Sequence, residues 1–104
     1  MIVGNTMTAN DLITRHLRIS GKVQGVGYRA GVEQKAAAFG LAGWVRNRLD
    51  GTVEAVIQGT PAQVETMIKW CHKGPFLARV REVLVSEDVE CEGTFMTFER
   101  RDTE

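Results

Sequence analysis

The chain has 104 residues, of which 43% are hydrophobic, so it is long enough to bury one core and too short for two. Thirteen lysines and arginines balance thirteen aspartates and glutamates, so overall charge gives no attraction to nucleic acid or to an acidic membrane surface. Any charged ligand must therefore be held by the local geometry of a site.

The N-terminal residues and the cysteines favour a cytoplasmic protein. Residues 1–12 lack the basic start and the long apolar run of a signal peptide, and we expect them to form a flexible arm. No stretch reaches the ~20 apolar residues that a membrane helix needs. Cys71 and Cys91 lack the spacing of a zinc or redox pair, which favours two free thiols over a single disulfide.

The first regular elements are a half-buried strand and a helix. Apolar and polar residues alternate from Ile13, with Leu17 on the side expected to be buried and His16 on the outer side. Apolar residues then recur at helical spacing from Tyr28 to Phe39, and the alanine run within this stretch favours a helix. A glycine follows directly, in the position that a left-handed helix cap prefers.

A β-hairpin is predicted next, and its register follows from the hydrophobic pattern. A two-residue turn would place Val53 opposite an arginine, which is implausible for a buried residue. A three-residue loop at Leu49–Gly51 instead pairs Val53 with Asn47 and Ala55 with Val45. Asn47 then faces inward near the end of its strand, where a polar amide requires a partner.

The second half of the chain contains a helix and two further strands. Thr60 and Gln63 can form a capping box around a proline at the first helical position, and the helix ends at Gly74. Strands are predicted at about 79–86 and 94–99. The acidic stretch between them is expected to be a solvated turn.

This order is β-α-β-β-α-β with an extra C-terminal strand. It is typical of the ferredoxin-like α/β sandwich, an α+β fold in which two helices cover one face of a mainly antiparallel sheet. We assign residues 13–101 to this domain and residues 102–104 to a C-terminal tail. The architecture hosts many unrelated activities, so the function must be argued from particular residues.

The loop between the first strand and the first helix is rich in glycine and reads G-K-V-Q-G-V-G-Y-R at residues 21–29. Glycine permits the positive φ angles that turn amide hydrogens inward, and the helix N-terminus adds free donors, which together suit a phosphate. Arg29 lies in the first helical turn, where a cation opposes the helix dipole by roughly 0.3–1 kcal/mol. An anion bound between Arg29 and Lys22 would explain this placement. The alternative is a flexible glycine turn with Arg29 in water.

Two other phosphate-binding motifs do not account for this loop. Residues 25–30 satisfy G-x-G-x-x-A, the dinucleotide fingerprint, but that motif belongs to a parallel βαβ unit and the strand after this helix turns into a hairpin. The match is therefore interpreted as chance. The nucleoside-triphosphate motif G-x-x-x-x-G-K-[ST] does not occur.

Two motifs follow one another along the chain. They are Gly21-x-Val23-Gln24-Gly25-Val26-x-Tyr28-Arg29 and Gly43-Trp44-Val45-x-Asn47, the second followed by Asp50-Gly51-x-Val53-Glu54. Together they resemble the signature of the acylphosphatase family. The similarity covers about Leu12 to Arg101. It implies hydrolysis of the carboxyl-phosphate mixed anhydride to a carboxylate and inorganic phosphate, without a metal or a cofactor.

The resemblance also implies roles for particular residues. Arg29 would bind the phosphoryl group and Asn47 would orient the attacking water, while the loop amides would cradle the phosphoryl oxygens. These amides belong to Gln24, Gly25, Val26, Gly27 and Tyr28. The tyrosine stands where the family commonly has phenylalanine. Arg48 follows Asn47 where many members carry threonine or an apolar residue, so we expect a second cation at the mouth of the site.

Two other classes of function stay open at this point. A non-catalytic module would bind an anion in the glycine loop without hydrolysing a substrate. An RNA-binding domain of similar architecture would need exposed aromatic residues on central strands, which His16 and Arg18 do not supply. We expect a monomer acting on a small acyl phosphate, with neither nucleic acid nor a membrane as a partner. The remaining candidates are interpreted as packing residues, uncoordinated histidines or surface charges: Trp44, Trp70, Cys71, His16, His72, Lys69, Lys73, Arg100 and Arg101.

Overall fold

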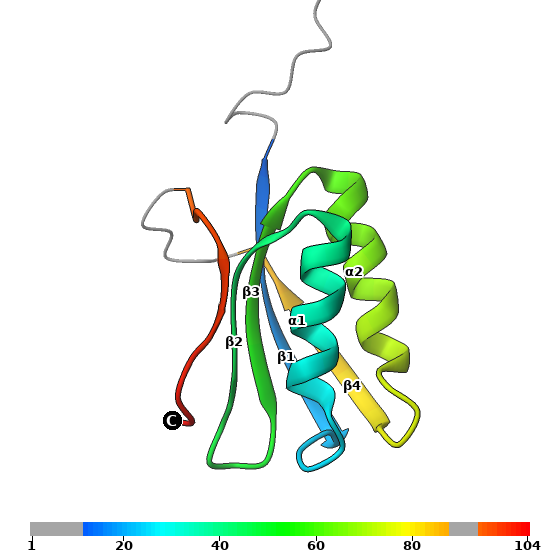
Figure 1. The fold of residues 1–104 in the computed structure, drawn as a ribbon. Helices are drawn as coiled ribbons and strands as arrows, with labels where there is room; N and C mark the ends of the chain where they lie inside the picture. Colours follow the sequence, from blue (N-terminus) through cyan, green and yellow to red (C-terminus); the bar gives the residue numbers. More distant parts are fainter. Residues whose placement is uncertain (1–11, 88–93) are drawn as a thin grey trace, which may run out of the picture.

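Two helices lie against one face of a five-stranded sheet in the computed structural model, which describes residues 12–87 and 94–104 (Figure 1). The elements in chain order are β1 (Ile13–Lys22), α1 (Tyr28–Phe39), β2 (Ala42–Asn47), β3 (Val53–Gly59), α2 (Pro61–Lys73), β4 (Arg79–Ser86) and β5 (Phe98–Arg100). The predicted ferredoxin-like fold is confirmed. The predicted arm (apart from Leu12), Cys91 and most of the acidic stretch lie outside the described residues.

The strand order is β4-β1-β3-β2-β5, and the pairing of its three middle strands positions the site. β1 and β2 each run antiparallel to β3, so the end of β1 and the end of β2 both adjoin the start of β3. Ile19 and Asn47 accordingly pair with the same residue, Val53, from opposite sides. The glycine loop after β1 therefore lies beside the β2–β3 hairpin, at the lower end of the sheet in Figure 1.

The core fills the space between the helices and the sheet. Alternate residues of the strands point toward the helices because successive side chains in a strand face opposite ways. The fully buried members include Leu17, Val45 and Ile57 from the sheet, with Val32 from α1 and Met67 from α2. None of the helices in the described part of the chain is long and apolar enough to cross a membrane.

Helix ends and the hairpin follow the sequence-based predictions. Gly40 adopts a left-handed conformation after α1, and Thr60 and Gln63 form the predicted capping box at the start of α2. In the hairpin, the Arg48 amide donates to the Thr52 carbonyl at 2.8 Å around a three-residue loop. The register of Asn47 with Val53 and of Val45 with Ala55 is confirmed.

The last strand is shorter and later than predicted. β5 contains only residues 98–100 and pairs in parallel with β2, whereas the predicted strand began at Thr94. The Phe95 amide donates instead to the side-chain oxygen of Gln58, so this part of the chain is held by a side chain and not by a strand ladder. Beyond β5 the chain continues beside β2, where the Glu104 amide donates to the Asn47 carbonyl at 3.2 Å.

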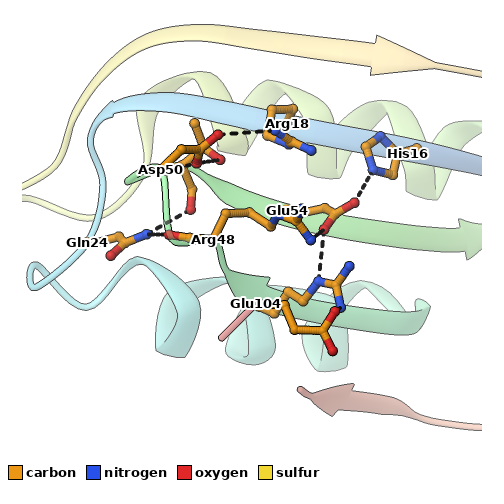
Figure 2. Close-up of polar contacts among 9 residues, drawn as sticks. His16, Arg18, Gln24, Arg48, Asp50, Glu54 and Glu104 are labelled. Atoms are coloured by element: carbon orange, nitrogen blue, oxygen red, sulfur yellow. Dashed lines mark hydrogen bonds and ion pairs between the residues drawn. The ribbon is translucent and has the colours of Figure 1, made fainter. Parts of the chain in front are cut away.

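The sheet face that the helices leave open carries a network of charged residues around Glu54 (Figure 2). Glu54 lies on β3, directly opposite Arg18 of β1 and Arg46 of β2. Its carboxylate accepts from His16 Nε2 at 2.6 Å, from Arg46 Nε at 2.8 Å and from Arg48 Nη1 at 3.2 Å. The side chain is only 10% exposed, so the donors replace the water that Glu54 loses on folding.

These donors also decide the ionisation of Glu54. Burial by itself would raise the pKa of the carboxyl, but the hydrogen bonds from His16 and Arg46 outweigh it and hold the pKa below the ordinary value of 4.5. A carboxyl whose pKa is depressed by folding stabilises the folded state above its unfolded pKa. That stabilisation is lost as the pH falls through the folded pKa.

We therefore expect Glu54→Gln to lower the free energy of unfolding at pH 7 by about 1–3 kcal/mol, because two arginines lose their anionic partner. The difference from the unchanged protein should be largest at neutral pH and should shrink below about pH 4.5, the ordinary pKa of the group. Urea denaturation at a series of pH values measures it. Glu99→Gln is the matched control, because Glu99 forms an exposed ion pair with Arg101 and should change stability by less than about 0.5 kcal/mol. An equal deficit for Glu54→Gln at pH 3 and pH 7 would contradict the argument.

Candidate active site

The glycine loop presents backbone donors at the start of α1. Gly25 and Gly27 have φ angles of 75° and 81°, in the left-handed region that favours glycine. Gly27 is the N-cap of the helix, and no side chain caps it. The first helical hydrogen bond runs from the Gly31 amide to the Gly27 carbonyl, so the amides of residues 28–30 have no acceptor within the helix. This end of the helix is therefore suited to bind an anion.

Arg29 lies at the same helix end. The first turn of α1 contains no acidic residue, so the positive end of the helix dipole and the guanidinium reinforce each other. Among the described residues, Arg29 has no hydrogen-bond or ion-pair partner. Its five donors therefore remain available to a ligand.

Asn47 lies at the end of β2 with its side chain on the helix side of the sheet. Its pairing with Val53 and the 3.2 Å hydrogen bond from the Glu104 amide to its carbonyl fix the backbone. The side-chain oxygen Oδ1 is buried and has no hydrogen-bond partner in the described part of the protein. Since buried polar atoms are normally paired, this oxygen is suited to accept a hydrogen bond from a group outside the chain.

Arg29, Asn47 and the glycine loop line one pocket of about 180 Å³, enough for roughly six water molecules. Its complete lining is Val23, Gln24, Gly25, Gly27, Tyr28, Arg29, Ala30, Asn47 and Arg100. Six of the seven residues predicted for the site are in this set. The exception is Val26, which packs against the hydrophobic core.

The side chain of Tyr28 faces the core and not the pocket. The residue is 1% exposed, and its ring packs against Trp70 at a centroid distance of 5.6 Å. The hydroxyl donates to the Cys71 carbonyl at 2.7 Å, and burial raises the pKa of this hydroxyl well above its usual range. Tyr28 can therefore offer a ligand its amide but no acid group.

Two arginines, Arg48 and Arg100, do not lie where the sequence predicted. The expectation that Arg48 lies at the mouth of the site is wrong, because its side chain is on the open face of the sheet and binds Glu54. Arg100, interpreted from sequence as a solvated surface charge, lines the pocket instead. Lys22 is exposed and is not part of the lining.

Gln24 ties the glycine loop to the hairpin that carries Asn47. Its side-chain nitrogen donates to the carbonyls of Arg48 and Thr52, each at 2.8 Å (Figure 2). These two carbonyls flank the hairpin loop, one residue beyond the pair formed by Asn47 and Val53. The sequence motif contained Gln24, but this use of its side chain depends on the fold and was not predicted.

A family model described as Acylphosphatase matches residues 15–100. The chain belongs to the acylphosphatase family. An acylphosphatase from Acidovorax sp. (strain JS42) is 50% identical over 91 residues, covering 88% of this chain and 92% of that protein. One from Thermococcus kodakarensis is 56% identical over 73 residues, covering 70% of this chain and 80% of that protein. The solved acylphosphatase structure from Coxiella burnetii matches with a TM-score of 0.84 at 34% identity, over 92% of this chain and 99% of that one.

Three further residues singled out from the sequence have structural surroundings that account for them. His16 is bonded to Glu54, and Trp44 lies under the guanidinium groups of Arg46 and Arg101 at 4.9 and 4.6 Å. Cys71 is buried, and burial raises the pKa of its thiol to about 12. Within residues 12–87 and 94–104, no three histidine, cysteine or acidic side chains are grouped so that they could hold a metal ion.

We expect Gln24→Ala to lower kcat by tenfold or more with a smaller effect on KM, because the loop would lose its fixed distance to Asn47. The assay is hydrolysis of benzoyl phosphate, combined with urea denaturation. Gln58→Ala is the matched control: it also removes side-chain hydrogen bonds, among them those with Thr14 and Phe95 at the other end of β3, and should lower stability without lowering kcat. A Gln24→Ala enzyme with unchanged kcat would show that the hydrogen bonds of Gln24 do not position the glycine loop relative to Asn47.

Proposed function

We propose that this chain hydrolyses acyl phosphates to a carboxylate and inorganic phosphate without a metal ion, in the pocket formed by the glycine loop, Arg29 and Asn47. Membership of the acylphosphatase family supports the class of reaction. The observation that carries the proposed site is the convergence of three features on one pocket: uncapped helix amides, an unpartnered arginine and the orphaned oxygen of Asn47.

Arg29 and the loop amides supply the stabilisation of charge. A transferred phosphoryl group passes through a loose transition state with negative charge on its peripheral oxygens. The guanidinium of Arg29 offers parallel donors that match two such oxygens, and amides of residues 24–28 can meet the others. These donors are fixed by the helix start and the left-handed glycines, so little reorganisation is needed during the reaction.

Asn47 orients the attacking water. Its free Oδ1 can accept a hydrogen bond from a water that faces the phosphorus, opposite the leaving carboxylate. An amide is not a base at neutral pH, so the water keeps its proton until the P–O bond to the carboxylate is largely broken. The proton then passes to a phosphate oxygen, and the products are the carboxylate and dihydrogen phosphate, which can lose a proton to water.

The leaving group explains why the pocket can work with so few groups. A carboxylate is stable as an anion near neutrality, so its departure needs no general acid. Among the described residues that line the pocket, none is aspartate, glutamate or histidine, and the Tyr28 hydroxyl is engaged in the core. The cytoplasmic location and the monomeric state stay predictions from the sequence.

We expect Arg29→Gln and Asn47→Ala each to lower kcat/KM for benzoyl phosphate by about 100-fold or more, as the loss of one transition-state donor does elsewhere. Release of inorganic phosphate measures the rate, and circular dichroism checks that the fold is intact. Arg81→Gln is the control for the charge change, because Arg81 lies exposed on β4, away from the pocket. Phosphate binding without any turnover by the unchanged protein would instead favour a non-catalytic anion-binding module.

Removal of metal ions should leave the rate unchanged. Dialysis against a chelator, followed by assay in its presence, is expected to alter kcat for benzoyl phosphate by less than twofold, because Arg29 and the amides stabilise the negative charge that a metal cation would otherwise neutralise. Restoration of a lost rate by added magnesium would contradict the proposal.

A further inference from the structure

Arg100 is the one charged residue besides Arg29 among the described residues that line the pocket. It comes from β5, on the far side of β2 from the glycine loop, and pairs with Val45 in the parallel ladder. Phe98, two residues earlier, packs against the core, so Arg100 also faces the helices. Arg101 points the opposite way, onto Trp44 on the open face of the sheet.

An ion pair with Glu33 sets the position of Arg100. The guanidinium Nε donates to Glu33 Oε1 at 3.0 Å. Glu33 follows Arg29 by four residues on α1, so it lies about 6 Å farther along the helix axis. Arg100 is therefore anchored to a residue one helical turn beyond Arg29, while its side chain lines the same pocket.

Arg29 and Arg100 can bind different parts of a substrate. Because Arg29 and the amides can together satisfy the phosphoryl oxygens, Arg100 remains available to another negatively charged group of the ligand. Arg100 and Glu33 are both more than a third exposed, so water competes with their ion pair and the pair contributes little to stability. A carboxylate on the substrate can therefore replace Glu33 at Arg100 at little cost.

We propose that Arg100 determines substrate specificity by favouring acyl phosphates whose acyl group carries a carboxylate of its own. This inference rests on the proposed function of the pocket and extends it to the acyl end of the substrate. The phosphoryl group binds at the helix start, the short acyl chain runs toward β5, and its carboxylate meets the Arg100 guanidinium. The reaction that supplies such a substrate is the phosphorylation of one carboxyl group of a short dicarboxylic acid.

The test compares succinyl phosphate, whose acyl group ends in a carboxylate, with benzoyl phosphate, whose acyl group is uncharged. We expect Arg100→Gln to lower kcat/KM for succinyl phosphate by tenfold or more and for benzoyl phosphate by no more than about threefold. Arg100→Lys keeps the charge and should retain the preference within about threefold. Arg101→Gln is the matched control, because it removes a neighbouring charge from the opposite face and should leave the ratio of the two rates unchanged.

The preference of the unchanged enzyme for succinyl phosphate should also decline as salt is raised, because screening weakens a partly exposed charge pair. Equal losses for both substrates in Arg100→Gln, or the same change of ratio in Arg101→Gln, would overturn the proposal. Benzoyl phosphate turnover by the unchanged enzyme, and its loss in Arg29→Gln, tests the pocket separately. Failure of the specificity inference is therefore distinguishable from failure of the proposed function.

Discussion

The antiparallel pairing of β3 with both β1 and β2 is the constraint on which the pocket depends. It brings the end of β1, where the glycine loop starts, to the end of β2, where Asn47 lies. The side chain of Gln24 then fixes the position of the glycine loop relative to the hairpin by donating hydrogen bonds to two hairpin carbonyls. The amides and Asn47 are therefore held by strand register and one amide side chain. Such a fixed arrangement is what a reaction stabilised by positioned dipoles requires.

The sheet separates the charged residues into two sets with different partners. On the open face the arginines surround Glu54, and the network is neutralised within the chain. On the helix face Arg29 has no partner in the described part of the protein, and Arg100 has only an exposed one. A protein without net charge can thus keep local cations for an anionic ligand. Within the described part of the chain, the open face also lacks the paired exposed aromatics of an RNA-binding sheet, since Trp44 is covered by two arginines.

The sequence predicted most of the fold and part of the pocket because both follow from local patterns. The register that faces Asn47 inward came from the hairpin loop and the burial of Val53, and the loop glycines came from their need for positive φ. The placement of Arg48 was wrong because its carboxylate partner, Glu54, lies across the strand pair on the outer face. Arg100 was missed because it reaches the pocket only through the parallel pairing of β5 with β2, a contact between distant segments whose register no local pattern encodes. The bounds of β5 were predicted too early and too long for the same reason, because its pairing with β2 joins distant segments of the chain.

The chemistry of the pocket also limits what it can hydrolyse. A phosphate ester releases an alcohol, whose alkoxide is nearly as basic as hydroxide, so its departure needs a proton donor. The described lining residues contain no carboxyl or imidazole group, and the buried Tyr28 hydroxyl donates to Cys71 while burial raises its pKa. In the proposed site the same donors would act on an ester, but the leaving group would remain unprotonated. Under the proposed function, selectivity for acyl phosphates over esters would therefore follow from the kind of group that lines the pocket, without any contact with the acyl chain.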